Sequence, residues 1–125
     1  MDVDTFHRLL DQLKGTPVVV NIWGSWCAPC KAEVPFFVTA AEAHPNIQFV
    51  GVDVLDSRDG ATAFIEALKM PYPSVFDPPA AIRADLASVG QPETFFFNAQ
   101  GSIVAKWPGQ ITPEALATDI ARISE

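Results

Sequence analysis

The sequence predicts one α/β domain in which a mainly parallel sheet is covered by helices on both faces. Two apolar runs, Val18–Trp23 and Ile47–Val54, have the nearly continuous hydrophobicity of strands that are buried on both faces. Segments with helical spacing of apolar residues alternate with these runs, and such alternation favours parallel pairing. A length of 125 residues fits a single domain, 1–125, with a core of its own.

The first half of the chain is predicted as helix, strand, helix and strand. Residues 3–13 carry apolar side chains at helical spacing, and Gly15 ends the pattern. A second helix is expected over residues 27–43, after the first strand, and Pro35 inside it predicts a kink. The turn residues 44–46 then lead into the second strand.

The second half adds a predicted antiparallel edge to the sheet. A helix capped by Ser57 or Asp59 precedes a short strand, and a further helix is expected to start at Pro78-Pro79 and to end at Gly90. Two strands around residues 98–101 have the pattern of a hairpin. The expected segments are strands at 74–76, 94–97 and 102–107, and a last helix capped by Thr112.

Composition excludes several classes of function. The net charge is −7 and the eight lysines and arginines are scattered, which argues against a nucleic-acid partner. No apolar run approaches the roughly 20 residues of a membrane-spanning helix. Residues 1–4 lack the basic and apolar regions of a signal peptide, so either the protein is cytoplasmic or a targeting segment lies upstream of this sequence.

The two cysteines, Cys27 and Cys30, form one C-x-x-C motif and predict thiol chemistry. Cys27 comes where a buried strand passes into a helix, so free backbone N–H groups and the helix dipole favour its thiolate. Cys30 lies one turn further along, within disulfide reach and less exposed. We therefore expect Cys27 to attack and Cys30 to resolve the mixed disulfide, with Pro29 helping to set the redox potential.

Two other uses of a C-x-x-C motif fit this chain less well. A zinc site needs four ligands, and the two histidines, His7 and His44, lie in a different helix and at a helix end. A purely structural disulfide stabilises little when it closes so short a loop.

Residues 18–35, with Trp26 before the first cysteine and Pro29 before the second, resemble the active-site signature of the thioredoxin superfamily. In particular they are similar to its TlpA/ResA/DsbE branch. Residues 90–95, Gly-Gln-Pro-Glu-Thr-Phe, resemble the cis-proline loop of that family. The resemblance covers essentially the whole chain. It implies a thioredoxin fold with a central mixed sheet and a helical insertion between the C-x-x-C helix and the cis-proline loop, after Val54 and before Val89.

The resemblance also implies roles for residues around the disulfide. The Gln91–Pro92 bond is expected to be cis and to face the disulfide, which leaves the Gln91 backbone free to pair with an extended substrate. Trp26 is expected beside the disulfide, where it shapes the docking surface. Thr94 either supports the site or packs within its strand, and Gly109 is a candidate for a small residue near the site.

Two positions separate the branches of the family. Plain thioredoxin has a buried aspartate where this chain has Asn21, and an amide does not relay protons as a carboxylate does. Glu33 matches the acidic residue of the TlpA-like branch. We expect Glu33 to tune the thiol pair and to accept the proton of Cys30; the alternative is an ordinary solvated helix glutamate.

The expected function is thiol–disulfide exchange with protein substrates, with no cofactor beyond the Cys27–Cys30 disulfide and no metal. The direction stays open between a reductase of the cytochrome c maturation kind and an oxidase of exported proteins. The alternatives are a peroxiredoxin-like peroxidase, and a redox sensor or metal-binding chaperone that uses the same cysteines.

The expected partners are protein thiols and disulfides together with an upstream redox partner. The branch resemblance favours an extracytoplasmic bacterial location, with a signal or membrane anchor upstream of this sequence. The acidic surface is compatible with a monomer.

Overall fold

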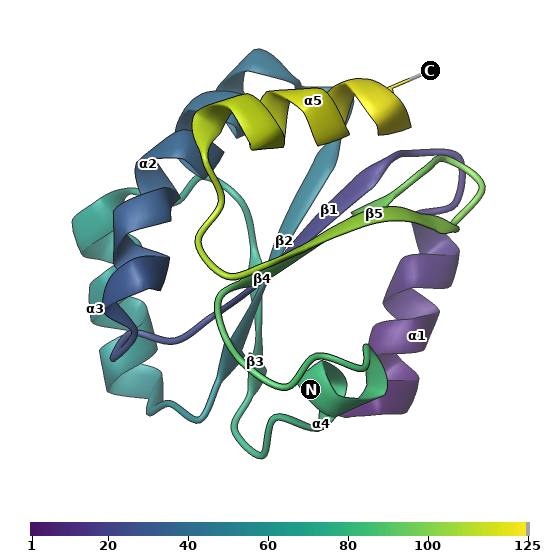
Figure 1. The fold of residues 1–125 in the computed structure, drawn as a ribbon. Coiled ribbons are helices and arrows are strands. Elements are labelled where there is room, and N and C mark those ends of the chain that lie inside the picture. The colour runs from purple at the N-terminus through teal and green to yellow at the C-terminus, as the bar shows by residue number, and fades with distance from the viewer. Residues whose placement is uncertain (125) are drawn as a thin grey trace.

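The computed structural model describes residues 1–124, and within them five helices and five strands alternate except where β5 follows β4 directly (Figure 1). The elements are α1 (Val3–Gln12), β1 (Val18–Trp23), α2 (Ala28–Ala43), β2 (Gln48–Val54), α3 (Arg58–Leu68), β3 (Ser74–Asp77), α4 (Ala81–Asp85), β4 (Glu93–Phe97), β5 (Ile103–Pro108) and α5 (Pro113–Ile123).

The strands form one mixed sheet in the order β3-β2-β1-β4-β5. β1 pairs in parallel with β2, and β2 with β3, whereas β4 runs antiparallel to β1 and β5 antiparallel to β4. Helices α2, α3 and α5 lie on one side of the sheet, and α1 and α4 lie on the other (Figure 1). The predicted class, a parallel sheet covered on both faces with an antiparallel edge, is confirmed.

Side chains alternate along β1 between two separate cores. Val19 and Trp23 pack with α2, α3 and α5, whereas Val20 and Ile22 pack with α1 and α4. Asn21 points to the same side as Val19 and Trp23, and the β1–β4 register places it opposite Thr94. The sheet therefore brings two polar side chains under the first turns of α2.

The helix expected to start at Pro78-Pro79 and to end at Gly90 is wrong in length. α4 has only five residues, because the Asp77 carboxylate accepts hydrogen bonds from the N–H groups of Ala81 and Ile82 at 2.9 and 3.0 Å and so fixes a later start. Ala87 has a φ of 59°, which ends the helical path before Gly90. Ser57, one of the two expected caps, is the N-cap of α3.

Other expectations concern length and organisation. The interval between β2 and the cis-proline loop contains α3, β3 and α4. That this interval is an insertion relative to plain thioredoxin stays a prediction, as does the organisation of residues 1–125 as a single domain.

α2 continues through Pro35. Within residues 1–124, none of the helices combines the length and the apolar content that a membrane crossing needs.

Candidate active site

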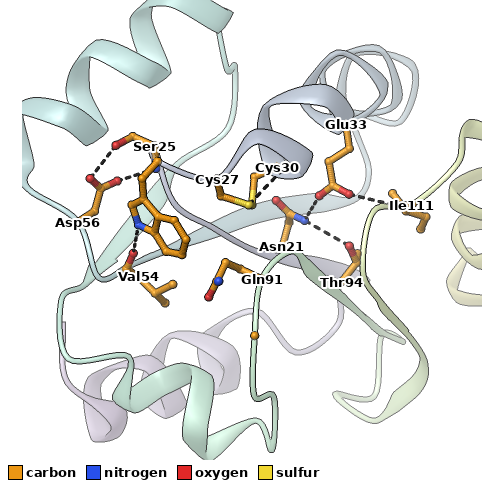
Figure 2. Close-up of a disulfide and its surroundings, with 12 residues drawn as sticks. Asn21, Ser25, Cys27, Cys30, Glu33, Val54, Asp56, Gln91, Thr94 and Ile111 are labelled. Carbon is orange, nitrogen blue, oxygen red and sulfur yellow. Dashed lines mark hydrogen bonds between the residues drawn. A yellow bond between two sulfur atoms is a disulfide. The ribbon is translucent and has the colours of Figure 1, made fainter.

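The two cysteines lie at the junction between β1 and α2, as predicted. Cys27 is the N-cap of α2, and its Sγ accepts a hydrogen bond from the N–H of Cys30 at 3.3 Å. The two residues form a disulfide with their Cα atoms 5.2 Å apart (Figure 2). Pro29 occupies the first turn of α2, where its missing N–H costs the helix no hydrogen bond.

The two sulfur-bearing residues differ in access to solvent. Cys27 is 5 % exposed and Cys30 is fully buried. The division between an attacking and a resolving cysteine stays a prediction. Trp26, 51 % exposed, donates its indole N–H to the Val54 carbonyl at 3.2 Å. A Cβ at Gly24 would approach this indole to 2.7 Å at Cε2, so the missing side chain of Gly24 gives the ring its place.

One flank of the disulfide holds a buried carboxyl group with a complete set of partners. Glu33 is fully buried on α2, one turn after Cys30, and receives hydrogen bonds from Asn21 Nδ2 at 2.8 Å and from the N–H of Ile111 at 3.0 Å (Figure 2). The same amide group of Asn21 also donates to Thr94 Oγ1 at 3.2 Å. Side chains from α2, β1 and β4 and the backbone before α5 thus meet at one carboxyl group.

Burial raises the pKa of Glu33 to about 7, although the hydrogen bonds from Ile111 and Asn21 act in the opposite direction. A carboxyl group with this pKa is present in both protonation states near neutral pH, so it can either accept or donate a proton. The interpretation of Glu33 as a solvated helix residue is wrong, since the side chain is enclosed.

The opposite flank contains two aspartates. Asp56 accepts hydrogen bonds from the N–H and the hydroxyl of Ser25 at 2.8 and 2.7 Å (Figure 2). It also accepts one from the N–H of Ser57 at 2.9 Å. Burial acts to raise the pKa of Asp56, but the neighbouring Asp53 and the hydrogen bonds from Ser25 and Ser57 outweigh it and hold that pKa below its usual value. Burial first, and then the neighbouring Asp56, raise the pKa of Asp53 to about 8.

The loop before β4 completes the site. The Gln91–Pro92 peptide bond is cis, as expected, and Gln91 lies beside the disulfide in Figure 2. Arg83 donates to the Gln91 side-chain oxygen at 2.6 Å, and the N–H of Gly109, at a φ of 84°, donates to the Pro92 carbonyl at 2.8 Å. Contacts from α4 and from the end of β5 therefore hold the loop on both sides.

The structure brings together every site residue that the sequence predicted: the three catalytic candidates and the residues expected to shape the site, namely Cys27, Cys30, Glu33, Trp26, Pro29, Gln91, Pro92 and Thr94. Sequence reasoning missed three contacts: Asn21 as a donor to Glu33, the Ser25–Asp56 pair, and the Arg83–Gln91 pair. The first had a signal, because Asn21 was singled out as a departure from plain thioredoxin. The other two join segments whose proximity depends on the fold.

The surroundings of the cysteines offer little to a metal ion. Among residues 1–124 no group of three or more histidine, cysteine, aspartate or glutamate side chains is arranged to hold one. His7 lies on α1 with its Nε2 2.6 Å from Asp85, and His44 ends α2. Neither histidine lies at the start of α2, where the cysteines are.

Comparisons with known proteins agree with this geometry. Residues 3–106 match the AhpC/TSA family. The thiol:disulfide interchange protein DsbE of Vibrio cholerae is 32 % identical over 121 residues, which cover 94 % of this chain and 65 % of the relative. The structure of a DsbF homologue from Corynebacterium diphtheriae has a TM-score of 0.83 and 31 % identity, and the match covers 90 % of this chain and 75 % of that one.

A secreted thiol-disulfide isomerase from Corynebacterium glutamicum is similar in the same way. Its structure has a TM-score of 0.82 and 29 % identity, with 93 % of this chain and 75 % of that chain covered. The chain spans about two thirds or less of the length of the curated relatives it matches, for instance 65 % of the Vibrio cholerae protein and 60 % of the Escherichia coli one.

Proposed function

The chain belongs to the AhpC/TSA family, within its TlpA/ResA/DsbE-like group, and from this premise we propose that it exchanges disulfides with protein substrates through Cys27 and Cys30. One observation carries the proposal: the sulfur of Cys27 caps the amino end of α2 and is bonded to a more deeply buried cysteine one turn later. This arrangement stabilises a thiolate on Cys27 and keeps its resolving partner within reach.

In the reducing direction, the Cys27 thiolate attacks a substrate disulfide and releases one substrate thiolate, which takes a proton from solvent. The result is a mixed disulfide between Cys27 and the substrate. Cys30, after loss of its proton, then attacks Cys27 Sγ, so the second substrate thiolate leaves and the Cys27–Cys30 disulfide forms. The substrate gains the two electrons that the two cysteines lose, and the oxidising direction is the reverse of these steps.

Glu33 accepts the proton of Cys30 in this scheme and returns it in the reverse direction. The carboxyl group lies one turn from Cys30 on the same helix, and its pKa of about 7 suits transfer in both directions. Asn21 and the N–H of Ile111 hold the carboxyl group in position, and they stabilise the charge that remains after proton release.

The substrate lies along the cis-proline loop. The backbone of Gln91 pairs with an extended segment of the substrate, as an added strand would, while Pro92 faces the disulfide. Trp26 supplies an exposed apolar surface beside Cys27, and Pro29 restricts the backbone between the cysteines. Thr94 supports the site through its hydrogen bond from Asn21.

The protein acts as an extracytoplasmic bacterial monomer of one domain that needs no cofactor beyond its own disulfide. Support for the location comes from the relatives, since the Corynebacterium glutamicum protein is described as secreted. An upstream redox partner restores the disulfide or the dithiol after each turnover.

The equilibrium of the Cys27–Cys30 pair with glutathione tests the proposal and assigns the direction. A reduction potential of about −270 mV makes the protein a reductase, and one of about −120 mV makes it an oxidase of exported proteins. Protein-disulfide exchange should be lost in Cys27→Ser. Exchange that persists in this variant, or a wild-type protein that exchanges with glutathione but with no protein disulfide, overturns the proposal.

A peroxidase function is not favoured, because the relatives are named as interchange proteins and because the attacking cysteine has its partner three residues later. The direct check is peroxide consumption by the reduced protein. Consumption at a rate comparable to disulfide exchange, and lost in Cys27→Ser, would revive that alternative.

A further inference from the structure

Asp53 is a buried acid that the exchange mechanism above does not use. It is 1 % exposed, and neither of its carboxyl oxygens has a hydrogen-bond partner at normal geometry within the described residues. Asp53 lies at the carboxyl end of β2, in register with Trp23 on β1 and with Phe76 on β3. Buried carboxyl groups without partners are costly, so this one calls for a physical explanation.

The segment that follows Asp53 is tied to the segment that leads to Cys27. The indole N–H of Trp26 is bound to the Val54 carbonyl at 3.2 Å, and Ser25 gives Asp56 two hydrogen bonds of 2.8 and 2.7 Å. Residues 23–26 and 53–56 are thus connected along their length. We call this set of contacts the Ser25–Asp56 clamp. It fixes the loop whose next residue is the attacking cysteine.

Helix α3 covers the clamp. A Cβ at Gly60 would lie 2.9 Å from Ser25 Oγ and 3.0 Å from Asp56 Oδ1, so the amino end of α3 approaches both partners closely. Asp56 also accepts from the N–H of Ser57, the N-cap of α3. Movement of Asp56 would therefore disturb both α3 and the loop before Cys27.

The charged groups that face Asp53 come from two elements. Asp56, on the loop after β2, is the acid that interacts with it. Arg58, on α3, shares with Asp53 the wall of a cavity of about 200 Å³, but its guanidinium lies over the Phe76 ring at 4.5 Å instead of pairing with Asp53. The remaining walls of the cavity include Trp23 and Ser74, which carry no charge.

We propose that Asp53 and Asp56 are positioning residues for Cys27, and that the pair does this while it carries a single negative charge, on Asp56. With Asp53 neutral, Asp56 keeps its negative charge and its hydrogen bonds from Ser25, and the clamp is closed. When Asp53 ionises, two like charges stand side by side in a poorly solvated place, and their repulsion displaces Asp56 from Ser25. The inference rests on the proposed function only because it takes the sulfur of Cys27 as the reacting atom.

The main test follows the backbone amide of Ser25 by ¹⁵N NMR between pH 6 and 9.5. In the wild type we expect its resonance to shift with a midpoint at the Asp53 pKa of about 8. Asp53→Asn keeps the shape of the side chain but cannot ionise, so the shift should disappear. Asp59→Asn removes an exposed carboxylate on the first turn of α3 and is the matched control, in which the wild-type shift should remain.

A second measurement follows the chemistry. The rate constant for oxidation of the reduced protein by glutathione disulfide at pH 7 should fall about tenfold in Asp56→Ala, because the loop that carries Cys27 loses its anchor. Asp59→Asn should react at the wild-type rate. In the wild type we expect the rate constant to decline above pH 8, and Asp53→Asn should lack this decline.

Three results would overturn the proposal: a Ser25 amide that does not titrate in the wild type, a titration that survives in Asp53→Asn, or an unchanged rate in Asp56→Ala. If a variant fails to fold, the ¹³C carboxyl resonance of Asp53 in the wild type decides, since a midpoint near its ordinary value of 3.8 also contradicts the proposal. Neither readout uses a protein substrate. A wild type without protein-disulfide exchange but with a titrating Ser25 therefore refutes the proposed function alone.

Discussion

The two flanks of the disulfide each hold a buried acid with a raised pKa, but the two acids are held in opposite ways. Glu33 has two donors on its carboxyl group, from Asn21 and from the backbone of Ile111. Within residues 1–124, Asp53 has no such donor, and its neighbour is another acid, Asp56. Burial is the largest cause of the raised pKa at both positions.

This difference separates two roles. A carboxyl group that is fully bonded in its charged form can lose and regain a proton without moving its neighbours, which is what proton transfer to Cys30 requires. A carboxyl group without donors next to a second acid disturbs its surroundings when it ionises. A near-neutral pKa therefore does not by itself identify a proton-transfer group. The hydrogen-bond partners of the two carboxyl oxygens determine which role the acid can have.

The largest effect that separates the flanks is expected from Glu33→Gln. Resolution of the mixed disulfide by Cys30 should slow about a hundredfold at pH 7, because the proton acceptor is lost. The measurement is the single-turnover release of reduced substrate after rapid mixing. Glu42→Gln, an exposed glutamate on the same helix, is the control and should release substrate at the wild-type rate. Equal rates in all three proteins would remove Glu33 from the mechanism.

Removal of the amide on the Glu33 flank is expected to affect stability. Asn21→Ala takes away the donor to Glu33 and to Thr94, so the free energy of unfolding of the oxidised protein should fall by about 1–3 kcal/mol. Urea unfolding at pH 7 measures this change. Asn46→Ala, in the exposed turn between α2 and β2, should change it by less than about 0.5 kcal/mol. An equally small change in Asn21→Ala would show that the Glu33 network is not held by its amide.

The two buried acids also make the stability of the protein depend on pH. Folding raises the pKa of Glu33 from 4.5 to about 7, so between these values the folded protein holds a proton that the unfolded chain has lost. The free energy of unfolding therefore falls as the pH rises through this window, by at most about 1.4 kcal/mol per pH unit for this group. Asp53 adds the same sign of dependence up to about pH 8.

Two variants show how much of the pH dependence of the unfolding free energy comes from Glu33 and how much from Asp53. In Glu33→Gln the decline below pH 7 should become shallower, and the part between pH 7 and 8 should remain. In Asp53→Asn the part between pH 7 and 8 should vanish. Urea unfolding at several pH values gives both slopes, and stability that rises with pH from 5 to 8 in the wild type would contradict the raised pKa values of both acids.

The smallest effect is expected at the cis-proline loop, which belongs to neither flank. Arg83→Met removes the donor to the Gln91 side chain and should raise the KM for a protein substrate about twofold, with kcat unchanged, because a part-exposed hydrogen bond contributes little. Arg8→Met, at an exposed position of α1, is the control for the lost charge. A kcat that falls while KM stays constant would mean that Arg83 acts on the reacting sulfurs rather than on docking.

The parts of the fold that depend on local pattern were predictable. Continuous apolar runs identified β1 and β2, and the strand-to-helix junction placed Cys27 at the start of α2. The short α4 was not predictable, because the Asp77 side chain, rather than the prolines after it, determines where that helix begins.

The candidate site was predictable only as far as its motifs. The cysteines and the Gln91–Pro92 loop are contiguous signatures, whereas the partners of Glu33 come from sites 12 and 78 residues away along the chain. The sequence does not indicate that the carboxyl group of Asp53 lacks hydrogen-bond partners within residues 1–124. In the sequence, Asp53 is only a polar residue within an apolar strand. Such contacts depend on register, which local composition does not determine.

The most direct test of the central claim is a trapping experiment with Cys30→Ser. This variant keeps the attacking sulfur and lacks the resolving one, so after incubation with a protein disulfide we expect a covalent adduct through Cys27, seen by mass spectrometry and released by dithiothreitol. Cys27→Ser should form no such adduct. An absence of adduct in Cys30→Ser, or equal trapping by both variants, would contradict the assignment of Cys27 as the attacking thiolate.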